Sequence, residues 1–398
     1  MGKFSKVVLK PGKEAAIQRR HPWIFSGAVG QVRGDASEGD IVEVFSSDGQ
    51  YLASGHFLKG SIAVKLFSFT ETPADYRFWL GRLHNALELR RKLGLTESPL
   101  TNAYRLVFSE GDDLPGMIID WYNGVAVMQA HSTGMQLLTQ VFTDALKEIY
   151  GDKLLAVYEK SPESMTHSNQ KSEILARDRF LFGSALPVEI AETGHKFKVD
   201  FINGQKTGFF LDQRSNRMFA QFYAKNRSVL NTFCYSGAFS VYCLKGGAHH
   251  VHSVDSSHQA IQWAKENLQL NGLDETRHSS ELADVKTLFK QNSLKYDMII
   301  VDPPAFAKTH QVTNNALHAY IHLNTAAIRS LNPGGLLFTF SCSQAISREM
   351  FRSAIQSAAI EAGKNIRILH HLSQGPDHPV NICHPEGEYL KGLILEVE

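Results

Sequence analysis

The chain has 398 residues, of which 43% are hydrophobic and 20% are charged, and its formal net charge is +1. These values are typical of a globular protein with two or three domains and exclude a disordered or fibrous chain. No run approaches the ~20 uninterrupted apolar residues that cross a bilayer, and the amino terminus lacks a secretory signal, so we expect a cytoplasmic protein with no membrane partner.

The amino-terminal segment is locally basic. Its first 33 residues hold seven basic side chains against one acidic side chain, and Arg19 and Arg20 stand side by side within RRHPWIFSGAV. Such a patch would bind phosphate groups independently of the base sequence. Charge alone, however, indicates an ordinary solvated surface more strongly than a nucleic-acid site.

Short β-prone runs separated by turn signals occupy the first part of the chain: VVLK, HPWIFSGAV, GDIVEVFSSDGQYLASGHF and SIAVKLFSF. They predict a small β-rich domain over residues 1–70. Apolar residues at helical spacing then predict a helix from Phe78 to Leu93. Further β-prone runs, an amphipathic helix from Met135 to Tyr150 and a strand in LLAVYEK predict a central α+β domain over residues 71–185.

From residue 186 to 398 strands alternate with helices, which is the pattern of an α/β domain with a parallel sheet covered on both faces. The expected strands are SVLNTF, HHVHSVD, YDMIIVD, GGLLFTFSC, RILHHLS and LILEVE. The expected helices are Ala238–Lys245, Gln259–Leu270, Asn315–Leu331 and Gln344–Ala362. In such a sheet the ligand lies beyond the carboxyl ends of the strands, where the strand order reverses.

The first two of these strands end in residues suited to a nucleoside cofactor. Gly237, after SVLNTF, allows close backbone approach, and Asp255, at the end of HHVHSVD, is placed to accept hydrogen bonds from two ribose hydroxyls. A nicotinamide enzyme would normally carry GxGxxG, so a dehydrogenase is disfavoured. We expect the neighbouring cofactor-binding residues to be Phe233, Tyr235, Ser236 and Ser256.

Two further aspartates follow later strands. Asp284, in ELADVKTLF, is placed to bind an adenine amino group, although a helix-capping role explains its position equally well. Asp302 ends YDMIIVD and is followed by Pro303 and Pro304, which fix the direction of its carboxylate. Phe306 is a candidate stacking partner for a substrate base, with a core aromatic as the alternative.

The segment Ser341-Cys342-Ser343 follows GGLLFTF, so Cys342 should lie at the same sheet edge as Asp302. A cysteine there can act as a nucleophile if the start of the helix from Gln344 favours its thiolate, and a buried packing residue is the alternative. Cys234 and Cys243 look like packing residues. Cys383 has two histidines nearby in HPVNICHPEGEYL, but no ligand set at metal spacing, so we expect no metal site.

Taken together, several segments give the chain a resemblance to a known family, the ribosomal RNA large subunit methyltransferase I family. These segments are RRHPWIFSGAV, RLVFSEGDDLPGMIIDWY, GQKTGFFLDQR, NTFCYSGAFSVY, VDPPAF, FSCS and HPEGEYLKGL. The resemblance covers nearly the whole chain. It implies S-adenosylmethionine as cofactor, 23S ribosomal RNA as partner, and 5-methylcytosine as product, and it allows a homodimer.

The resemblance also implies a fold and a set of roles. The fold is an N-terminal PUA-type RNA-binding β domain, a small central α+β domain and a C-terminal Rossmann-like class I methyltransferase domain that ends in an antiparallel strand. Cys342 occupies the nucleophile position, Asp302 falls on the DPP motif, and Gln213 borders the pocket. Gly237, Asp255 and Asp284 match cofactor positions, whereas the usual threonine before the glycine is Ser236 here.

Two alternatives remain open from the sequence. A DPP loop also serves methylation of amines, which needs no cysteine. A non-catalytic RNA-binding assembly factor that keeps S-adenosylmethionine affinity would show the same cofactor motifs. Replacement of Cys342 and identification of the methylated nucleoside distinguish these alternatives from cytosine methylation, in which a thiolate at carbon 6 activates carbon 5.

Overall fold

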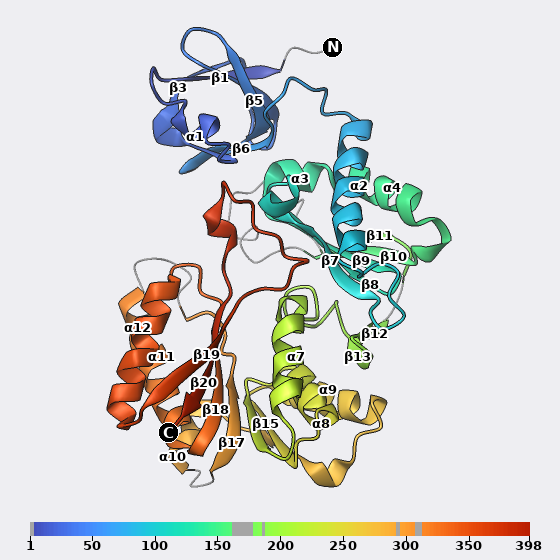
Figure 1. Cartoon of the computed structure of the whole chain (residues 1–398). Coiled ribbons are helices and arrows are strands. Elements are labelled where there is room, and N and C mark those ends of the chain that lie inside the picture. The colour runs from blue at the N-terminus through green and yellow to red at the C-terminus, as the bar shows by residue number, and fades with distance from the viewer. Residues whose placement is uncertain (1–3, 161–177, 185–187, 292–294, 307–312) are drawn as a thin grey trace. The chain divides into compact units, whose positions relative to one another are not determined.

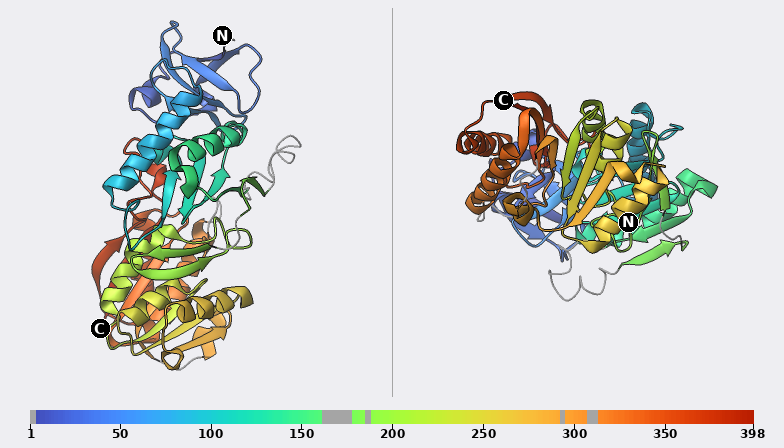
Figure 2. Two further views of the ribbon diagram at one scale, coloured as in Figure 1. Left: turned by 90° about the vertical axis from the view of Figure 1, so that its right-hand side faces the viewer. Right: turned by 90° about the horizontal axis from the view of Figure 1, so that it is seen from below.

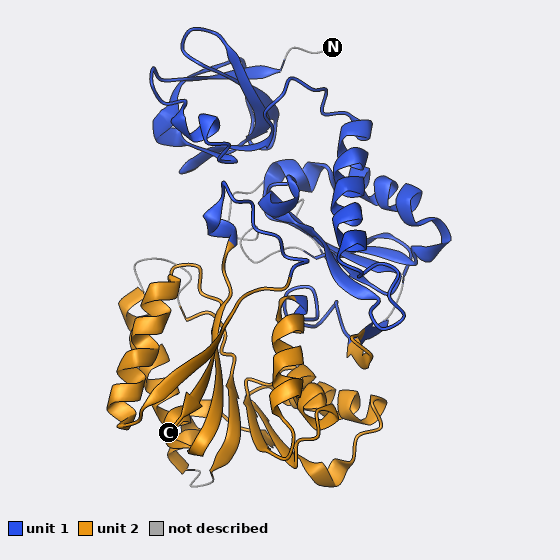
Figure 3. Cartoon of the chain, viewed as in Figure 1, with its two compact units in different colours: residues 1–191, 199–211, 376–387 blue, residues 192–198, 212–375, 388–398 orange. Residues whose placement is uncertain are grey.

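The computed structural model describes the chain except for residues 1–3, 161–177, 185–187, 292–294 and 307–312 (Figure 1). The described residues form two compact units (Figure 3). Unit 1 comprises residues 1–191, 199–211 and 376–387, and unit 2 comprises residues 192–198, 212–375 and 388–398. The division into three domains with boundaries near residues 70 and 185 stays a prediction.

Unit 1 begins with a six-stranded sheet in the order β2-β6-β5-β4-β1-β3. Period-two alternation builds its interior: Val42 and Val44 in β4 are fully buried, whereas Glu43 between them is only half-buried. The buried positions of the sheet form one hydrophobic core. The elements are β1 (Ser5–Leu9), α1 (Ala15–Gln18), β2 (Trp23–Phe25), β3 (Val29–Arg33), β4 (Ile41–Phe45), β5 (Tyr51–Phe57) and β6 (Ile62–Ser68).

A five-stranded sheet in the order β11-β10-β9-β8-β7 follows, packed with helices around a second core. Helix α2 begins at Tyr76 because Asp75 accepts a hydrogen bond from the Phe78 amide at 3.0 Å. The single helix expected from Met135 to Tyr150 is wrong: two helices meet at Leu138, whose ψ of 1° departs from the helical value. The elements are α2 (Tyr76–Lys92), β7 (Ala103–Phe108), β8 (Met117–Tyr122), β9 (Val125–Ala130), α3 (Thr133–Leu137), α4 (Thr139–Tyr150), β10 (Ala156–Glu159) and β11 (Arg179–Phe182).

Unit 2 is built on a seven-stranded sheet in the order β16-β15-β14-β17-β18-β20-β19. Neighbouring strands are parallel except at β20, which is antiparallel to both β18 and β19. This confirms the expected α/β fold with an antiparallel strand near its end. The strands are β14 (Ser228–Thr232), β15 (His250–Asp255), β16 (His278–Leu282), β17 (Tyr296–Val301), β18 (Leu331–Ser341), β19 (Ile366–Leu372) and β20 (Lys391–Val397). Strands β12 (Val188–Glu192) and β13 (His195–Val199) form a two-stranded sheet apart from these seven strands.

Helices cover both faces of this sheet. Helices α10, α11 and α12 lie on one face and α7, α8 and α9 lie on the other (Figures 1 and 2). The inner strands are therefore buried on both sides, and in β17 Ile299 and Ile300 face opposite helical layers with no exposed area. The helices are α7 (Arg214–Tyr223), α8 (Ala238–Lys245), α9 (His258–Leu270), α10 (Val285–Gln291), α11 (Thr313–Arg329) and α12 (Arg348–Ala362).

Within the described ranges, no helix combines the length and the apolar content that a bilayer-spanning helix requires.

Candidate active site

The strand order of unit 2 reverses between β14 and β17, which lie side by side although β15 and β16 intervene in the chain. The register places Thr232 beside Val254 and Val301, and Val301 beside Thr339. Because these four strands are parallel, the segments that follow them leave the sheet at one edge. The structure thus brings the turn after β14, Asp255, Asp302 and Cys342 to the same edge, as the sequence predicts.

The turn after β14 has an unusual backbone. Phe233 and Tyr235 both adopt positive φ angles, 54° and 46°, and Gly237 follows at 73°. A left-handed backbone is unfavourable for the two aromatic residues and persists only where surrounding contacts impose it. Such strain is frequent where the backbone must approach a ligand, which agrees with a cofactor role for this turn.

Gly237 is required by packing as well as by its φ angle. It ends the turn and precedes α8, and a Cβ atom added to it would lie 2.8 Å from the Cβ of Ala264 in α9. Ser236, just before it, is buried, and its carbonyl oxygen accepts a hydrogen bond from Asn267 Nδ2 at 2.9 Å. The turn is therefore held against α9 from two successive residues.

Asp255 ties the turn to the end of β15. Its Oδ2 accepts a hydrogen bond from the Tyr235 amide and its Oδ1 accepts one from the Ser257 amide, both at 2.9 Å. Each carboxylate oxygen has a second lone pair, so the half-buried group keeps acceptor capacity for ribose hydroxyls. The donor set of the turn and Asp255 therefore fits a nucleoside cofactor. Ser256 lies next to it and is exposed.

Asp284 follows β16 and precedes α10. Its Oδ1 accepts hydrogen bonds from the Thr287 amide at 3.0 Å and from the Thr287 hydroxyl at 3.2 Å. The residue is exposed and acts as a helix cap, which was the alternative that its position suggested. A contact with adenine stays a prediction.

Asp302 is fixed by a residue from a distant segment. Gln213, which is buried just before α7, donates a hydrogen bond from Nε2 to Asp302 Oδ2 at 2.9 Å. The Oε1 of Gln213 in turn accepts a hydrogen bond from Asn216 Nδ2 at 2.6 Å, which fixes the orientation of its amide. The structure therefore places Gln213 beside the DPP segment and identifies it as a residue that orients the Asp302 carboxylate.

The two prolines after Asp302 differ in exposure: Pro303 is buried and Pro304 is exposed. Phe306 is half-buried, and its ring centroid lies 4.9 Å from that of Tyr320 in α11. The ring thus packs against the core of unit 2 with part of its surface exposed. Its proposed stacking on a base stays a prediction.

Cys342 lies beside the DPP segment. Its Sγ is 3.9 Å from the carbonyl oxygen of Pro303, and the residue is half-buried. Cys234 and Cys243 are buried, and burial raises the pKa of both thiols well above the usual value. Cys383 belongs to unit 1.

The helix expected to begin at Gln344 begins instead at Arg348. Ser347 caps it by accepting a hydrogen bond from the Met350 amide at 3.2 Å, and the residues from Cys342 to Ser347 are not helical. The proposed favouring of a Cys342 thiolate by the start of this helix is therefore wrong, because a helix dipole acts only within about one turn of its end.

Lys391, a residue to which sequence reasoning gave no role, supplies the positive charge instead. It begins β20 directly opposite Ser341 in β18 and is 3% exposed. Its Nζ donates a hydrogen bond to the Ser343 carbonyl at 2.7 Å, which places the ammonium group beside Cys342. Burial lowers the pKa of Lys391 to about 8, while interaction with the charge of Cys342 opposes this shift. The sequence signal that could have indicated this residue is a single lysine, Lys391, directly before the apolar run GLILEV.

Arg19 and Arg20 belong to unit 1 and are exposed. The guanidinium carbon of Arg20 lies 5.8 Å from the centre of the Phe69 ring. Both side chains are accessible to a phosphate, and their role in RNA binding stays a prediction.

A cavity of about 570 Å³ lies between α10 and α11 and includes Lys295 and Ser330, the residues that precede β17 and β18. It therefore lies at the amino-terminal edge of the sheet. Because ligands of such sheets bind at the carboxyl edge, it is distinct from the candidate active site.

Comparisons with known proteins agree with this geometry. The family model "S-adenosylmethionine-dependent methyltransferase" matches residues 111–388, and the model "PUA-like domain" matches residues 7–69. A putative S-adenosylmethionine-dependent methyltransferase from Streptococcus mutans superposes with a TM-score of 0.84 at 23% identity, covering 98% of this chain and all of that one. This likeness supports the fold.

Relatives named "Ribosomal RNA large subunit methyltransferase I" match nearly the full length. The protein from Aeromonas hydrophila is 39% identical and that from Aliivibrio fischeri is 38% identical, each match covering 98% of this chain and 99% of the relative. These matches confirm the resemblance that the sequence motifs indicate. The chain belongs to the ribosomal RNA large subunit methyltransferase I family of S-adenosylmethionine-dependent methyltransferases.

Proposed function

We propose that the protein methylates carbon 5 of a cytosine in large-subunit (23S) ribosomal RNA, with Cys342 as the nucleophile. The observation that carries the proposal is the contact of the half-buried Cys342, whose Sγ lies 3.9 Å from the carbonyl oxygen of Pro303, the residue that follows the oriented Asp302. The name of the relatives from Aeromonas hydrophila and Aliivibrio fischeri supports ribosomal RNA as the substrate.

S-adenosylmethionine supplies an electrophilic methyl group on a positively charged sulfur. The residues proposed to hold it are Asp255, through the ribose, and the backbone of the turn from Phe233 to Gly237. Ser256 and Asp284 complete the proposed set, although the capping bond already uses one oxygen of Asp284. Gln213 acts on this pocket through Asp302 in the proposed arrangement.

Cysteine addition solves a specific chemical problem, because carbon 5 of cytosine is a weak nucleophile. The Cys342 thiolate forms a bond to carbon 6, and the electron pair of the ring double bond moves to carbon 5. Carbon 5 then bonds to the methyl carbon as the bond from that carbon to sulfur breaks. A base removes the proton from carbon 5, the pair re-forms the double bond, and Cys342 leaves as a thiolate.

Lys391 favours the reactive form of the cysteine in this proposal. A thiolate is stabilised by a nearby cation, and the buried ammonium is held beside Cys342 by its bond to the Ser343 carbonyl. The low exposure of Lys391 strengthens the effect, because little water screens the two charges. Below a pH of about 8 Lys391 retains its proton, so the ammonium group continues to stabilise the Cys342 thiolate.

The remaining residues position the RNA. Asp302, oriented by Gln213, would hydrogen-bond the ring nitrogen or amino group of the base, and Pro303 and Pro304 fix its direction. The exposed part of Phe306 would contact a base that is extruded from its stack. Arg19 and Arg20 would bind phosphates and supply affinity rather than specificity.

Amine methylation through the DPP segment is the competing activity, since that segment is present and Pro304 is exposed. The two activities are separated by Cys342→Ala, assayed with labelled cofactor and unmodified ribosomal RNA, followed by identification of the product nucleoside. We expect 5-methylcytosine from the wild type and a loss of at least about 1000-fold in the variant. Cys383→Ser, a change in the other unit, should keep full activity.

Retained transfer by Cys342→Ala, or a product methylated on nitrogen, would establish amine methylation. Absence of transfer by the wild type, together with measurable cofactor binding, would instead indicate a non-catalytic assembly factor.

A further inference from the structure

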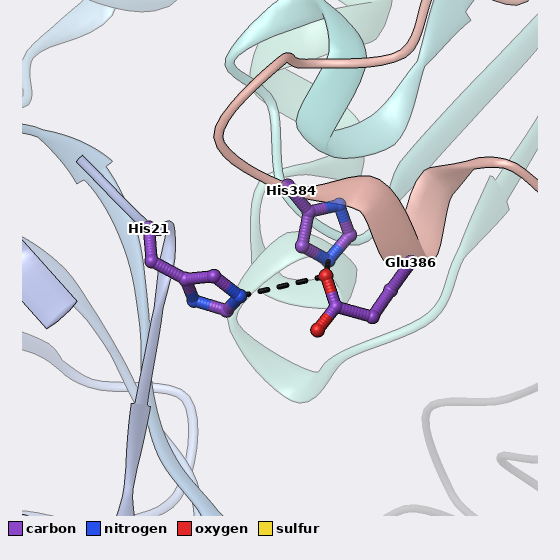
Figure 4. A group of neighbouring side chains, drawn as sticks. All are labelled: His21, His384 and Glu386. Carbon is purple, nitrogen blue, oxygen red and sulfur yellow. Dashed lines mark ion pairs between the residues drawn. The ribbon is translucent and has the colours of Figure 1, made fainter. Parts of the chain in front are cut away.

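Three potential metal ligands from distant parts of the sequence converge within unit 1. His21 follows α1, whereas His384 and Glu386 lie in the segment of residues 376–387 (Figure 4). Glu386 Oε2 lies 3.5 Å from His21 Nε2 and 3.7 Å from His384 Nε2, and the three ligand atoms all lie within 4.8 Å of one another. Ligand atoms around a tetrahedral zinc ion are about 3.4 Å apart, so only small side-chain movements separate this arrangement from a metal centre.

The environment of His384 points independently to a ligand. Its side chain is buried, with 3% exposure, and neither ring nitrogen has a hydrogen-bond partner among the residues that the structure describes. Buried polar atoms are nearly always satisfied, and an ion in the cluster would satisfy one of these nitrogens.

The other two side chains have the properties expected of metal ligands. His21 Nδ1 accepts a hydrogen bond from the Trp23 amide at 3.1 Å and also lies 3.3 Å from the Trp23 carbonyl oxygen, so the backbone of Trp23 fixes the orientation of the ring. When Nε2 binds an ion, Nδ1 carries the hydrogen and donates it to the carbonyl oxygen in place of the amide contact. The side chain of Glu386 is 46% exposed, which leaves a route for ion entry and a coordination position for water.

The segment that carries His384 and Glu386 is held in place without an ion. Arg90 Nη2 donates a hydrogen bond to the carbonyl oxygen of Asp377 at 2.7 Å, and Asp377 Oδ2 accepts one from the Arg105 amide at 3.1 Å. The ring of His384 packs edge-on against Trp23, with 4.4 Å between ring centroids. The ligands are therefore pre-positioned, which reduces the entropy lost on binding.

We propose that His21, His384 and Glu386 form a zinc site that links residues 376–387 to the N-terminal six-stranded sheet. Two imidazoles and one carboxylate with an open fourth position suit Zn²⁺, which accepts nitrogen and oxygen ligands in tetrahedral geometry. The site is separate from the proposed methyl-transfer chemistry and does not depend on it.

The test uses the full chain without a polyhistidine tag, freed of metal by a chelator. Zn²⁺ binding is measured by competition with a chromophoric chelator, and the bound metal is counted by elemental analysis. We expect one zinc per chain. Because loss of an outer-shell partner alone costs about 10- to 100-fold in affinity, Glu386→Gln and His21→Gln should each weaken binding by at least about 100-fold.

Glu388→Gln is the matched control, because its carboxylate is similarly exposed, 42% against 46%, and lies two residues further along the chain. It should bind zinc as the wild type does. Glu386→Gln removes an exposed group and should leave the circular dichroism spectrum unchanged, so its result reports on binding rather than folding. Zinc binding that is equal in wild type and Glu386→Gln, or absent from both, would overturn the proposal and leave the cluster as an ion pair only.

Discussion

At the scale of single residues, the proposed reactivity of Cys342 depends on the position of Lys391. A buried ammonium is unfavourable unless nearby groups compensate it, and here the Ser343 carbonyl accepts its hydrogen bond. The sequence predicts Cys342 and Asp302 as site residues because both directly follow strands. It missed Lys391 because the pairing of β20 with β18 joins segments whose register no local pattern shows.

Replacing Lys391 by methionine should make Cys342 less reactive at neutral pH, since the thiolate loses the nearby cation. We expect the pH of half-maximal alkylation by iodoacetamide, followed by mass spectrometry of the peptide, to rise by about one unit or more. Lys391→Arg keeps the charge and serves as the control. Superimposable curves for Lys391→Met and the wild type would show that the ammonium has no influence on the thiol.

Gln213→Ala should slow methyl transfer because Asp302 loses the hydrogen bond that orients it. We expect kcat to fall by about 10- to 100-fold while the Kd for S-adenosylmethionine changes less than twofold, as measured by single-turnover kinetics and calorimetry. Asn216→Ala is a milder comparison, since it leaves Gln213 in place and removes the bond that orients its amide, together with a bond from Asn216 Nδ2 to the Ser373 carbonyl oxygen. A weakened cofactor affinity with unchanged kcat would assign Gln213 to the cofactor instead.

At the scale of elements, six of the seven strands of the large sheet in unit 2 were predicted, because most of them are short apolar runs. Strand β16 was not among the predicted strands, since HSSEL contains a single apolar residue. Helix α8 was predicted with its observed bounds, Ala238–Lys245. The start of α12 was misplaced because Ser347 caps it after a non-helical segment, and a capping serine among other serines is not distinctive. Helix α7 was not predicted, since RSNRMFAQFY has few apolar residues and buries polar ones, including Asn216 and Arg217.

The turn between β14 and α8 gives a prediction about a whole element. Gly237→Ala adds a Cβ atom 2.8 Å from Ala264 and forces alanine into a left-handed conformation. We expect α8 and α9 to move apart, with a loss of about 1–3 kcal/mol in the free energy of unfolding and weaker cofactor binding. Urea denaturation and calorimetry measure the two effects. An unchanged stability and affinity would mean that the turn tolerates a side chain and does not contact the cofactor closely.

At the scale of the whole molecule, the net charge is only +1, although the amino-terminal segment is strongly basic. The parallel sheet allowed the sequence to predict which residues share its carboxyl edge. No sequence pattern indicates that His21, His384 and Glu386 form a cluster, because these residues come from opposite ends of the chain and follow no spacing rule. A cytoplasmic location and a homodimer stay predictions.

Reversing the charge at Arg19 and Arg20 should weaken RNA binding in a salt-dependent way. If both contact phosphates, the slope of log K against log salt should become shallower by about two, and affinity at low salt should fall. Filter binding of ribosomal RNA over a salt series measures the slope, with the exposed pair Lys286→Glu/Lys290→Glu in unit 2 as a control of equal charge change. Equal slopes for Arg19→Glu/Arg20→Glu and the control would exclude specific phosphate contacts by this pair.

RNA that carries 5-fluorocytidine tests whether the Cys342 sulfur bonds to carbon 6 of a cytosine. Fluorine cannot leave carbon 5 as a proton does, so the reaction should stop after methyl transfer with enzyme and RNA still joined. We expect a denaturant-resistant complex that requires S-adenosylmethionine, maps to Cys342 by mass spectrometry and is absent from Cys342→Ala. A wild type that methylates normal RNA but forms no adduct, or an adduct at another residue, would contradict the proposed mechanism.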